Sequence, residues 1–367
     1  MLRQYRLKDY KFSLVLMTTI LSVIGILVIG SANSSYQRPQ TLGLILGLIL
    51  MVIVSLIDYN WLLNFYWLEY FVGIALLLAV EVVGQNAGGA TRWLNLGFVQ
   101  FQPSDVEKII LILFYAKLFQ KYEEKLNTFK MILFFIITLG IPVYLIYRQP
   151  NLSTSILTLL LFCSMIFIAG LSYKIIGGIL AVCIPAGILF FGTMIRQGSS
   201  FFLAYQMQRI LAWLYPDEYP EIAYQQQNSI IAIGSGQLYG KGLDNNAVSS
   251  VKNGNFIAEP QTDFIFAVAG EELGFLGCCI IVILELLVAL ECVRIGRNAR
   301  DLAGTLIGCG MGALIFIQCF INVCVATGMM PNTGLPLPFV SYGLTSLVSF
   351  FIGIGIVLNV GLQVRKY

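Results

Sequence analysis

Ten apolar runs follow one another along the chain, each near the length that a helix needs to cross a lipid bilayer. The runs cover residues 12–30, 42–57, 65–83, 106–119, 129–147, 152–171, 175–193, 264–290, 302–327 and 342–362. About 20 apolar residues span the hydrocarbon core, and a helix satisfies its own backbone hydrogen bonds there. The pattern predicts an all-α, polytopic integral membrane protein with about ten transmembrane helices, organised as one membrane domain over residues 1–367.

A long and more polar segment, residues 194–262, separates the seventh run from the eighth. Near its start, residues 201–214 interleave aromatic and aliphatic side chains with Gln206, Gln208 and Arg209. This pattern is typical of a helix that lies in a membrane interface. Glycines then cluster at 234–236 and 240–242, which predicts flexible loop. We expect a large extracytoplasmic loop within the membrane domain.

The basic residues set the expected orientation. If the N-terminus is inside, the inner loops and their helix ends hold Lys117, Lys121, Lys125, Lys130, Lys174, Arg294, Arg297 and Arg300. The short outer loops hold only Arg38, Arg92 and Arg148. An excess of lysine and arginine marks the cytoplasmic side. We therefore expect a multi-pass protein of the plasma membrane with both termini in the cytoplasm.

Composition narrows the available chemistry. The chain is 58% hydrophobic and 11% charged, with a net charge of +3 that does not indicate nucleic acid binding. It has no histidine, so acid–base chemistry must rest on Asp, Glu, Lys or Tyr. Its eight cysteines lie in or beside apolar runs, without the spacing of a thiolate metal site.

Polar residues gather at the expected outer edge, where burial of a charge is costly and indicates function. Ser104 and Glu107 have the spacing of a capping box at the start of the fourth helix. Asp105 suits the same helix start and lies one turn from Lys108. Capping does not explain Lys108 or Arg92, which either bind an anionic ligand or only pair with Asp105.

Two further polar clusters precede helices. Asn151 is a good N-cap for the sixth helix, and capping alone is enough to explain it. Thr262 can cap the eighth helix and would place Asp263 in its first turn, where a carboxylate is favoured. Alternatively, Asp263 is desolvated beneath the long loop and accepts a proton from a hydroxyl, with Glu271 and Glu272 about two turns further along.

The segment 331–343 contains three prolines and two glycines at the same edge, so it cannot be regular helix. Irregular backbone at membrane depth is tolerated when it is buried in protein or lines a cavity. Two interpretations remain open: a re-entrant loop that closes a site, or packing alone.

Several of these motifs, in one order, resemble the SEDS family of RodA/FtsW-type peptidoglycan polymerases. They read Arg92-Trp93, Gln102 to Asp105, Gln149 to Thr154, Thr262 to Ala267 with Glu271 to Gly274, and Leu337 to Gly343. The outer loop is also similar, at residues 209–214, 224–225 and 230–236. The resemblance covers most of the chain from Arg92 onward. Asp105 stands where the family usually has Glu, Asn151 where it has Asp, Gln261 where it often has His, and Leu344 where it has a second Gly.

The resemblance implies a peptidoglycan glycosyltransferase that polymerises lipid II at the outer face of a bacterial plasma membrane. It places the catalytic aspartate on Asp263 and implies substrate-binding roles for Arg92, Lys108, Arg209, Asp105, Asn151, Glu271 and Ser341. It implies a class B penicillin-binding transpeptidase as partner, no organic cofactor, and room for a divalent cation such as Mg²⁺ or Mn²⁺. A lipid II flippase and a non-catalytic scaffold for the transpeptidase are the alternative functions.

Overall fold

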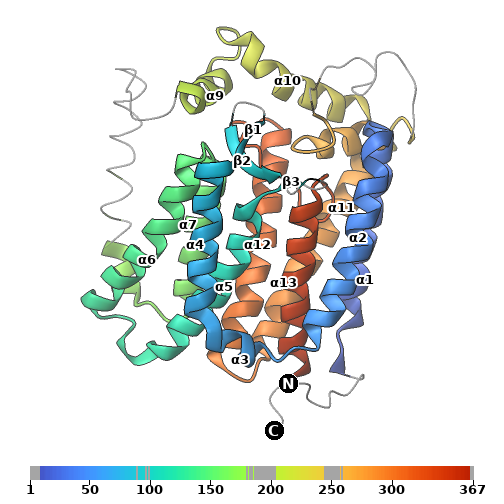
Figure 1. The fold of residues 1–367 in the computed structure, drawn as a ribbon. Helices are drawn as coiled ribbons and strands as arrows, with labels where there is room; N and C mark the ends of the chain where they lie inside the picture. Colours follow the sequence, from blue (N-terminus) through green and yellow to red (C-terminus); the bar gives the residue numbers. More distant parts are fainter. Residues whose placement is uncertain are drawn as a thin grey trace.

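Long helices form one bundle in the computed structural model, which describes residues 9–363 apart from 88–89, 96, 98–99, 179–180, 182–184, 186–203, 244–256 and 258 (Figure 1). The described helices are α1 (Phe12–Ala32), α2 (Ser34–Ser55), α3 (Tyr59–Leu62), α4 (Tyr66–Val83), α5 (Pro103–Lys121), α6 (Phe129–Arg148), α7 (Leu152–Ile168), α9 (Ala204–Leu214), α10 (Pro220–Ser235), α11 (Ile265–Arg297), α12 (Leu302–Ala326) and α13 (Leu344–Leu362). Short 3-10 turns lie at Leu63–Phe65 and Glu123–Lys125, and residues 173–178 are also helical.

The all-α, polytopic membrane fold is confirmed. Seven helices in the described part of the chain are long and apolar enough to cross a membrane. α7 has only 17 residues, and α5 carries charged residues that include Asp105, Glu107 and Lys108. Both still run through the bundle beside the seven (Figure 1). The predicted seventh span, 175–193, falls mostly outside the described residues.

α12 and α13 are the central helices. Their membrane-length windows are 72% and 78% buried, against 28–39% for the other candidate spans. α13 packs on α2, and α12 packs on α11, α5 and α7. Polar residues on α12 and α13 therefore face protein rather than lipid.

A small antiparallel sheet of order β1-β2-β3 was not predicted from the sequence. It comprises β1 (Gln85–Ala87), β2 (Ala90–Asn95) and β3 (Gln100–Phe101), between α4 and α5. It lies at the same end of the bundle as α9 and α10, which we call the loop end (Figure 1). The opposite end, where α3 lies, is called the base (Figure 1).

Two predicted helix starts are wrong. α5 begins at Pro103 after Gln102, and no side chain caps it, so Ser104 and Glu107 form no capping box. Glu107 is instead buried beside Gly73 of α4. α11 has Phe264 at its N-cap position, so Thr262 does not cap it and Asp263 lies before its first turn. Asn151, in contrast, caps α7 as predicted, accepting a hydrogen bond from the Thr154 amide at 3.3 Å.

The glycine clusters at 234–236 and 240–242 do not form the predicted flexible loop. The first cluster forms the end of α10. Residues 237–242, which follow it, pack against a kink in α11 at Gly274. The Phe275 amide donates to the Gln237 carbonyl at 2.8 Å, and the Lys241 amide donates to the Glu271 carbonyl at 2.9 Å. A Cβ atom on Gly274 would lie 2.2 Å from the Gly240 amide nitrogen. Glycine is therefore needed for close backbone approach rather than for mobility.

The helix predicted at 201–214 is confirmed over its described part as α9, Ala204–Leu214, while residues 201–203 fall outside the described residues. Its place in a membrane interface stays a prediction. The Trp213 indole donates to the Gly328 carbonyl at 2.8 Å, which ties α9 to the end of α12. The Gln226 amide of α10 donates to the Val325 carbonyl at 2.8 Å. These bonds hold α9 and α10 over the loop end of the bundle.

Candidate functional site

Asp263 lies in the turn before α11, at the loop end. Its backbone carbonyl accepts a hydrogen bond from the Asn322 side chain of α12 at 2.8 Å. Its side chain is partly exposed. Desolvation by the surrounding protein raises the pKa of the Asp263 carboxyl, and nearby Glu259 raises it further, while Arg209 and Arg92 lower it. Asp263 is thus a partly desolvated carboxylate, and Arg209 and Arg92 stabilise its negative charge.

The two arginines come from distant parts of the chain. Arg209 lies on α9 and donates to the Asn332 carbonyl at 3.2 Å. Arg92 lies on β2 and donates to the Gln149 carbonyl at 3.3 Å and to the Pro150 carbonyl. The structure therefore brings Asp263, Arg209 and Arg92 to one place, as the resemblance implied. Their roles toward a substrate remain predictions.

The segment 331–343 closes over this place and is fastened to it. The Ser341 hydroxyl donates to the Thr262 carbonyl at 2.8 Å and accepts from the Leu337 amide at 2.7 Å. The Tyr342 amide donates to the Gln261 carbonyl at 2.9 Å. Ser341 is buried. Its contacts position the turn that carries Asp263, and they use its hydroxyl both as donor and as acceptor.

Residues 331–336 have no helical structure. This segment lies between the site on one side and an apolar groove on the other. A Cβ atom on Gly334 would lie 3.2 Å from the Asp263 Oδ2 atom and 3.7 Å from an Arg209 nitrogen. Pro331, Thr333 and Leu335 line the groove instead. Gly334 therefore faces the charged cluster, while the residues on either side of it face the groove. The segment is thus a shared wall between the charged cluster and the groove.

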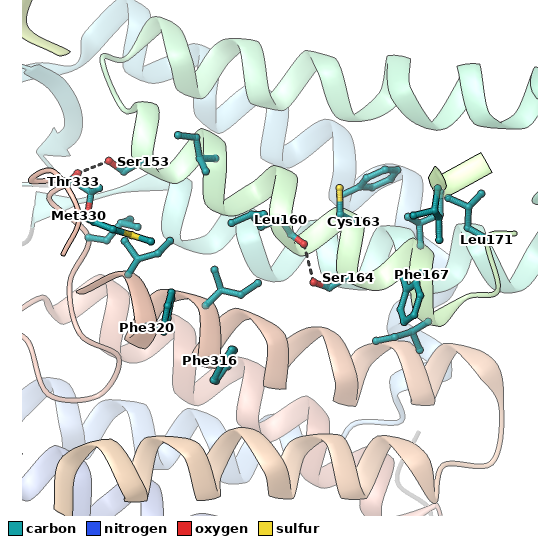
Figure 2. Close-up of a pocket in the computed structure, with 18 of the residues that line it drawn as sticks. Ser153, Leu160, Cys163, Ser164, Phe167, Leu171, Phe316, Phe320, Met330 and Thr333 are labelled. Carbon is teal, nitrogen blue, oxygen red and sulfur yellow. Dashed lines mark hydrogen bonds between the residues drawn. The ribbon is translucent and has the colours of Figure 1, made fainter. Parts of the chain in front are cut away.

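The groove has a volume of about 940 Å³ and runs between α7 and α12 (Figure 2). Cys163 and Phe167 of α7 line it on one side, and Phe316 and Phe320 of α12 line it on the other. At its loop end, the Ser153 hydroxyl donates to the Thr333 carbonyl (Figure 2). The lining is almost entirely apolar, so the groove fits a hydrocarbon chain.

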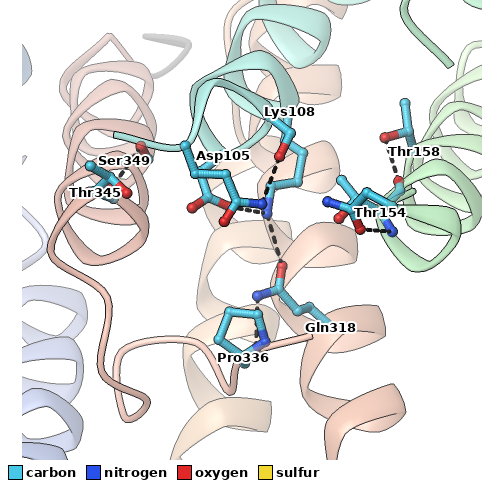
Figure 3. A network of polar contacts seen from close by, with 11 residues as sticks. Asp105, Lys108, Thr154, Thr158, Gln318, Pro336, Thr345 and Ser349 are labelled. Carbon is cyan, nitrogen blue, oxygen red and sulfur yellow. Dashed lines mark hydrogen bonds and ion pairs between the residues drawn. The ribbon is translucent and has the colours of Figure 1, made fainter. Parts of the chain in front are cut away.

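Asp105 and Lys108 lie in a buried layer of polar residues (Figure 3). The Lys108 ammonium group contacts the Asp105 Oδ1 atom at 2.9 Å and donates to the Gln318 Oε1 atom at 3.3 Å. Gln318 in turn donates to the Pro336 carbonyl at 2.8 Å. The predicted pairing of Lys108 with Asp105 is confirmed. The chain of bonds joins α5, α12 and the 331–343 segment, which makes it a support for the site.

Glu271 and Asn151 have structural partners of their own. The Glu271 carboxylate pairs with Lys241 at 2.7 Å, next to the crossing of Gly240 and Gly274. Asn151 is buried and caps α7. The structure thus separates the predicted binding residues into a charged cluster around Asp263 and supporting residues around it.

The sequence analysis missed Asn322, Gln318 and Gln40. Asn322 is buried and donates to the carbonyls of Asp263 and Leu335, at 2.8 and 2.7 Å. Gln40 of α2 donates to the Ser341 carbonyl at 3.0 Å. One signal was present: Gln318 and Asn322 are four residues apart, so they share a face of an otherwise apolar helix.

We expect Asn322→Leu to lower both stability and turnover, because two buried carbonyls lose their donor. Each such loss costs about 1–3 kcal/mol, and the turn that carries Asp263 is released. Thermal unfolding and turnover of the purified protein measure the two effects. Thr327→Val is the control, since the Thr327 hydroxyl bonds only within α12, to the Val323 and Cys324 carbonyls. Equal effects of the two changes would contradict the positioning role of Asn322.

A metal centre held by protein side chains is not found in the described part of the chain, which has no cluster of three Asp, Glu, Cys or His residues. Glu259 is an acidic residue whose negative charge raises the pKa of Asp263, and its side chain is exposed. Magnesium is often bound by one or two carboxylates together with substrate phosphates. A cation here would depend on a phosphorylated substrate for most of its ligands.

Comparison with known proteins agrees with this architecture. The chain is 34% identical to the peptidoglycan glycosyltransferase MrdB of Escherichia coli K12, over 95% of this chain and 92% of that one. It is 30% identical to the probable peptidoglycan glycosyltransferase FtsW of Geobacter sp. strain M18, over 98% of this chain and 99% of that one.

Solved structures show the same fold. A chain of a peptidoglycan synthase complex that coordinates polymerization and crosslinking matches with a TM-score of 0.78 and 26% identity, over 96% of this chain and 97% of that one. The rod shape determining protein RodA of Thermus thermophilus matches with a TM-score of 0.70 and 25% identity, over 98% of each chain. The family profile for cell cycle proteins of the FtsW, RodA and SpoVE type matches residues 6–366, and the chain belongs to that family.

Proposed function

We propose that this protein is a peptidoglycan glycosyltransferase that polymerises lipid II, with Asp263 as its general base. The names of its relatives give the reaction class. The observation that carries the residue assignment is the placement of a desolvated carboxylate with two arginines behind one wall of an apolar groove. A lipid-linked pyrophosphate sugar needs all three features: an apolar channel, positive charge and a base.

In the proposed reaction, the 4-hydroxyl oxygen of one GlcNAc attacks the anomeric carbon of a MurNAc on a lipid pyrophosphate. The bond from that carbon to the pyrophosphate oxygen breaks, which inverts the configuration. The Asp263 carboxylate accepts the hydroxyl proton, and its raised pKa makes it a stronger base than an ordinary aspartate. Arg209 and Arg92 stabilise the negative charge that develops on the departing pyrophosphate.

The groove between α7 and α12 is the proposed path of an undecaprenyl chain. A chain in the groove would leave its pyrophosphate at the loop end, beside Ser153 and Thr333. Residues 331–336 lie between the groove and Asp263, so the pyrophosphate must pass the edge of this segment to reach Arg209 and Arg92. A divalent cation is proposed only as a companion of the pyrophosphate, where it would add positive charge; no proton transfer depends on it.

The proposed partner is a class B penicillin-binding transpeptidase. The related structure of a synthase complex is described as coordinating polymerization with crosslinking. A polymerase that makes uncrosslinked strands needs a crosslinking enzyme close by, which supports the same pairing here.

The direct test is polymerisation of purified lipid II by the purified protein, with no other polymerase in the preparation. Glycan strands longer than the disaccharide are the expected product. Movement of lipid II across vesicles without strand formation would instead indicate a flippase. If neither activity appears while the transpeptidase still binds, the protein is a scaffold.

We expect the pH dependence of turnover to identify Asp263 as the base. The ionised carboxylate is the active form, so turnover rises with pH through the pKa of Asp263. Arg209 lowers that pKa and Glu259 raises it. Arg209→Gln should therefore move the acid limb of the profile to higher pH, and Glu259→Gln should move it to lower pH. Shifts in the same direction, or no shift in either variant, would contradict the assignment.

The proposed orientation places the loop end outside and both termini in the cytoplasm. Tyr239 is exposed at the loop end, and Glu124 is exposed between α5 and α6 at the base. In a background without native cysteines, we expect Tyr239→Cys to react with an impermeant thiol reagent in intact cells. Glu124→Cys should react only after permeabilisation. The reverse pattern would overturn the orientation.

A further inference from the structure

A second cavity is lined by residues from the start of α1 and the end of α11, whereas Asp263 precedes the other end of α11. α1 begins and α11 ends at the base (Figure 1). The cavity has a volume of about 610 Å³. Its lining consists of Ser13, Met17, Leu287, Leu290, Glu291, Val293, Arg294 and Arg297. The proposed reaction uses none of these residues, so the cavity needs a separate explanation.

One end of the cavity is basic. Arg294 and Arg297 lie in the last turn of α11, and both are exposed. A smaller adjoining cavity of about 110 Å³ shares Arg294 and is also lined by Lys11. The Lys11 side chain packs over α13, with its Cγ atom 3.6 Å from where a Cβ atom of Gly361 would lie. Three cationic side chains thus line two cavities that have Arg294 in common.

The other end is apolar and open at the side of the bundle. Leu287, Leu290 and Val293 are 43%, 53% and 38% exposed, and Met17 of α1 faces the same space. Leu287, Leu290 and Arg294 follow the three- and four-residue spacing of one helix face. A ligand that fills this cavity must therefore be anionic at the base and apolar toward the middle of the bundle.

A simpler explanation covers only part of these observations. Arginines at a helix C-terminus stabilise the helix dipole, and basic residues mark the cytoplasmic side. Neither effect requires a cavity. Glu291 lies 3.5 Å from Arg294 and offsets one positive charge, but two of the three cations remain in excess.

We propose that this cavity binds an anionic diacyl phospholipid. The phosphate lies between Arg294, Arg297 and Lys11, and the Ser13 hydroxyl is placed to donate a hydrogen bond to the headgroup. One acyl chain follows Met17, Leu287 and Leu290 along the α1–α11 seam. Basic pockets between membrane helices on the cytoplasmic side bind anionic lipid headgroups in the same way.

The site is independent of the proposed reaction, because it lies at the opposite end of the bundle from Asp263 (Figure 1). A lipid bound there would contact both α1 and α11 and would hold them together. Its loss should therefore affect thermal stability more than the pH profile of turnover.

The test is a titration of the purified full-length protein in detergent, followed by native mass spectrometry and thermal unfolding. The probes are dioleoylphosphatidylglycerol, dioleoylphosphatidylcholine, inorganic phosphate and undecaprenyl pyrophosphate. We expect phosphatidylglycerol to bind more tightly than phosphatidylcholine and to raise the unfolding temperature. The double variant Arg294→Gln/Arg297→Gln should weaken phosphatidylglycerol binding by roughly 30-fold, since each basic residue near a membrane surface contributes about a fivefold factor.

Arg300→Gln is the matched control, because Arg300 is exposed in the turn directly after α11 but does not line the cavity, and it should bind phosphatidylglycerol like the wild type. Leu290→Trp fills the apolar end and leaves the charges in place, so it should weaken binding even if the double variant does not fold. The proposal fails if phosphatidylcholine binds equally well or if Leu290→Trp binds normally. Tighter binding of undecaprenyl pyrophosphate at this site would replace the phospholipid with a lipid-linked substrate.

Discussion

Asp263→Asn is expected to lower the polymerisation of lipid II by about 10²–10⁴-fold, the usual range for loss of a general base. Asparagine has nearly the same size and keeps the backbone carbonyl that binds Asn322. It cannot accept a proton at neutral pH. Strand formation from purified lipid II, measured beside thermal unfolding, is the required pair of measurements.

Stability should not fall in this variant. Asp263 does not cap α11. Its pKa is raised in the folded protein, so the ionised carboxylate costs stability as pH rises above the ordinary value of 3.8. An uncharged asparagine removes that cost, and Asp263→Asn should unfold at the same temperature as the wild type or higher at neutral pH.

Glu259→Gln is the matched control, since it removes a carboxylate from the turn before α11 without removing the proposed base. We expect it to retain turnover at neutral pH. Full turnover by well-folded Asp263→Asn protein would end the catalytic assignment. An equal loss in Glu259→Gln would mean that charge near the turn matters more than the identity of the base.

Gly274→Ala is expected to destabilise the protein by about 2–5 kcal/mol, from overpacking and backbone strain together. Gly274 has φ 68° and ψ −168°, a conformation that only glycine adopts readily. The added Cβ atom would also lie 2.2 Å from the Gly240 amide nitrogen, which is backbone and cannot move aside alone. Thermal unfolding in detergent and the yield of folded protein measure the loss.

Gly234→Ala is the control for this prediction. Gly234 lies in α10, and a Cβ atom there would meet no atom within 4 Å. Alanine favours helix by up to about 1 kcal/mol over glycine, so the control should be neutral or more stable. Similar unfolding temperatures for both variants would show that the crossing of residues 236–243 over the kink does not support the fold.

Much of the site was predictable from residue type and order. The sequence placed Asp263, Arg92 and the 331–343 segment at one edge of the membrane, because charged and helix-breaking residues are costly elsewhere. The pairing of Lys108 with Asp105 and the capping by Asn151 depend on residues three apart, and both were correct.

Interactions between distant segments were the part that could not be predicted. Glu107 has the spacing of a capping residue, yet it is buried beside Gly73, which lies on another helix. The glycines of 240–242 resemble a mobile loop, and only the kink at Gly274 shows that they pack against backbone. Local patterns describe what one segment favours alone, and a partner segment can override that preference.

The sequence by itself determined that the chain is a bundle of membrane helices, and at which edge the polar residues collect. Hydrophobic length and the cost of buried charge act within one segment, so both can be read along the chain. The tertiary structure alone decided which polar residues meet. It brought Arg209 and Arg92 to Asp263, gave Asn322 its role in holding the turn that carries Asp263, and opened a groove beside the 331–336 wall. These contacts join residues more than 50 positions apart, and their formation depends on how the helices pack around α12 and α13.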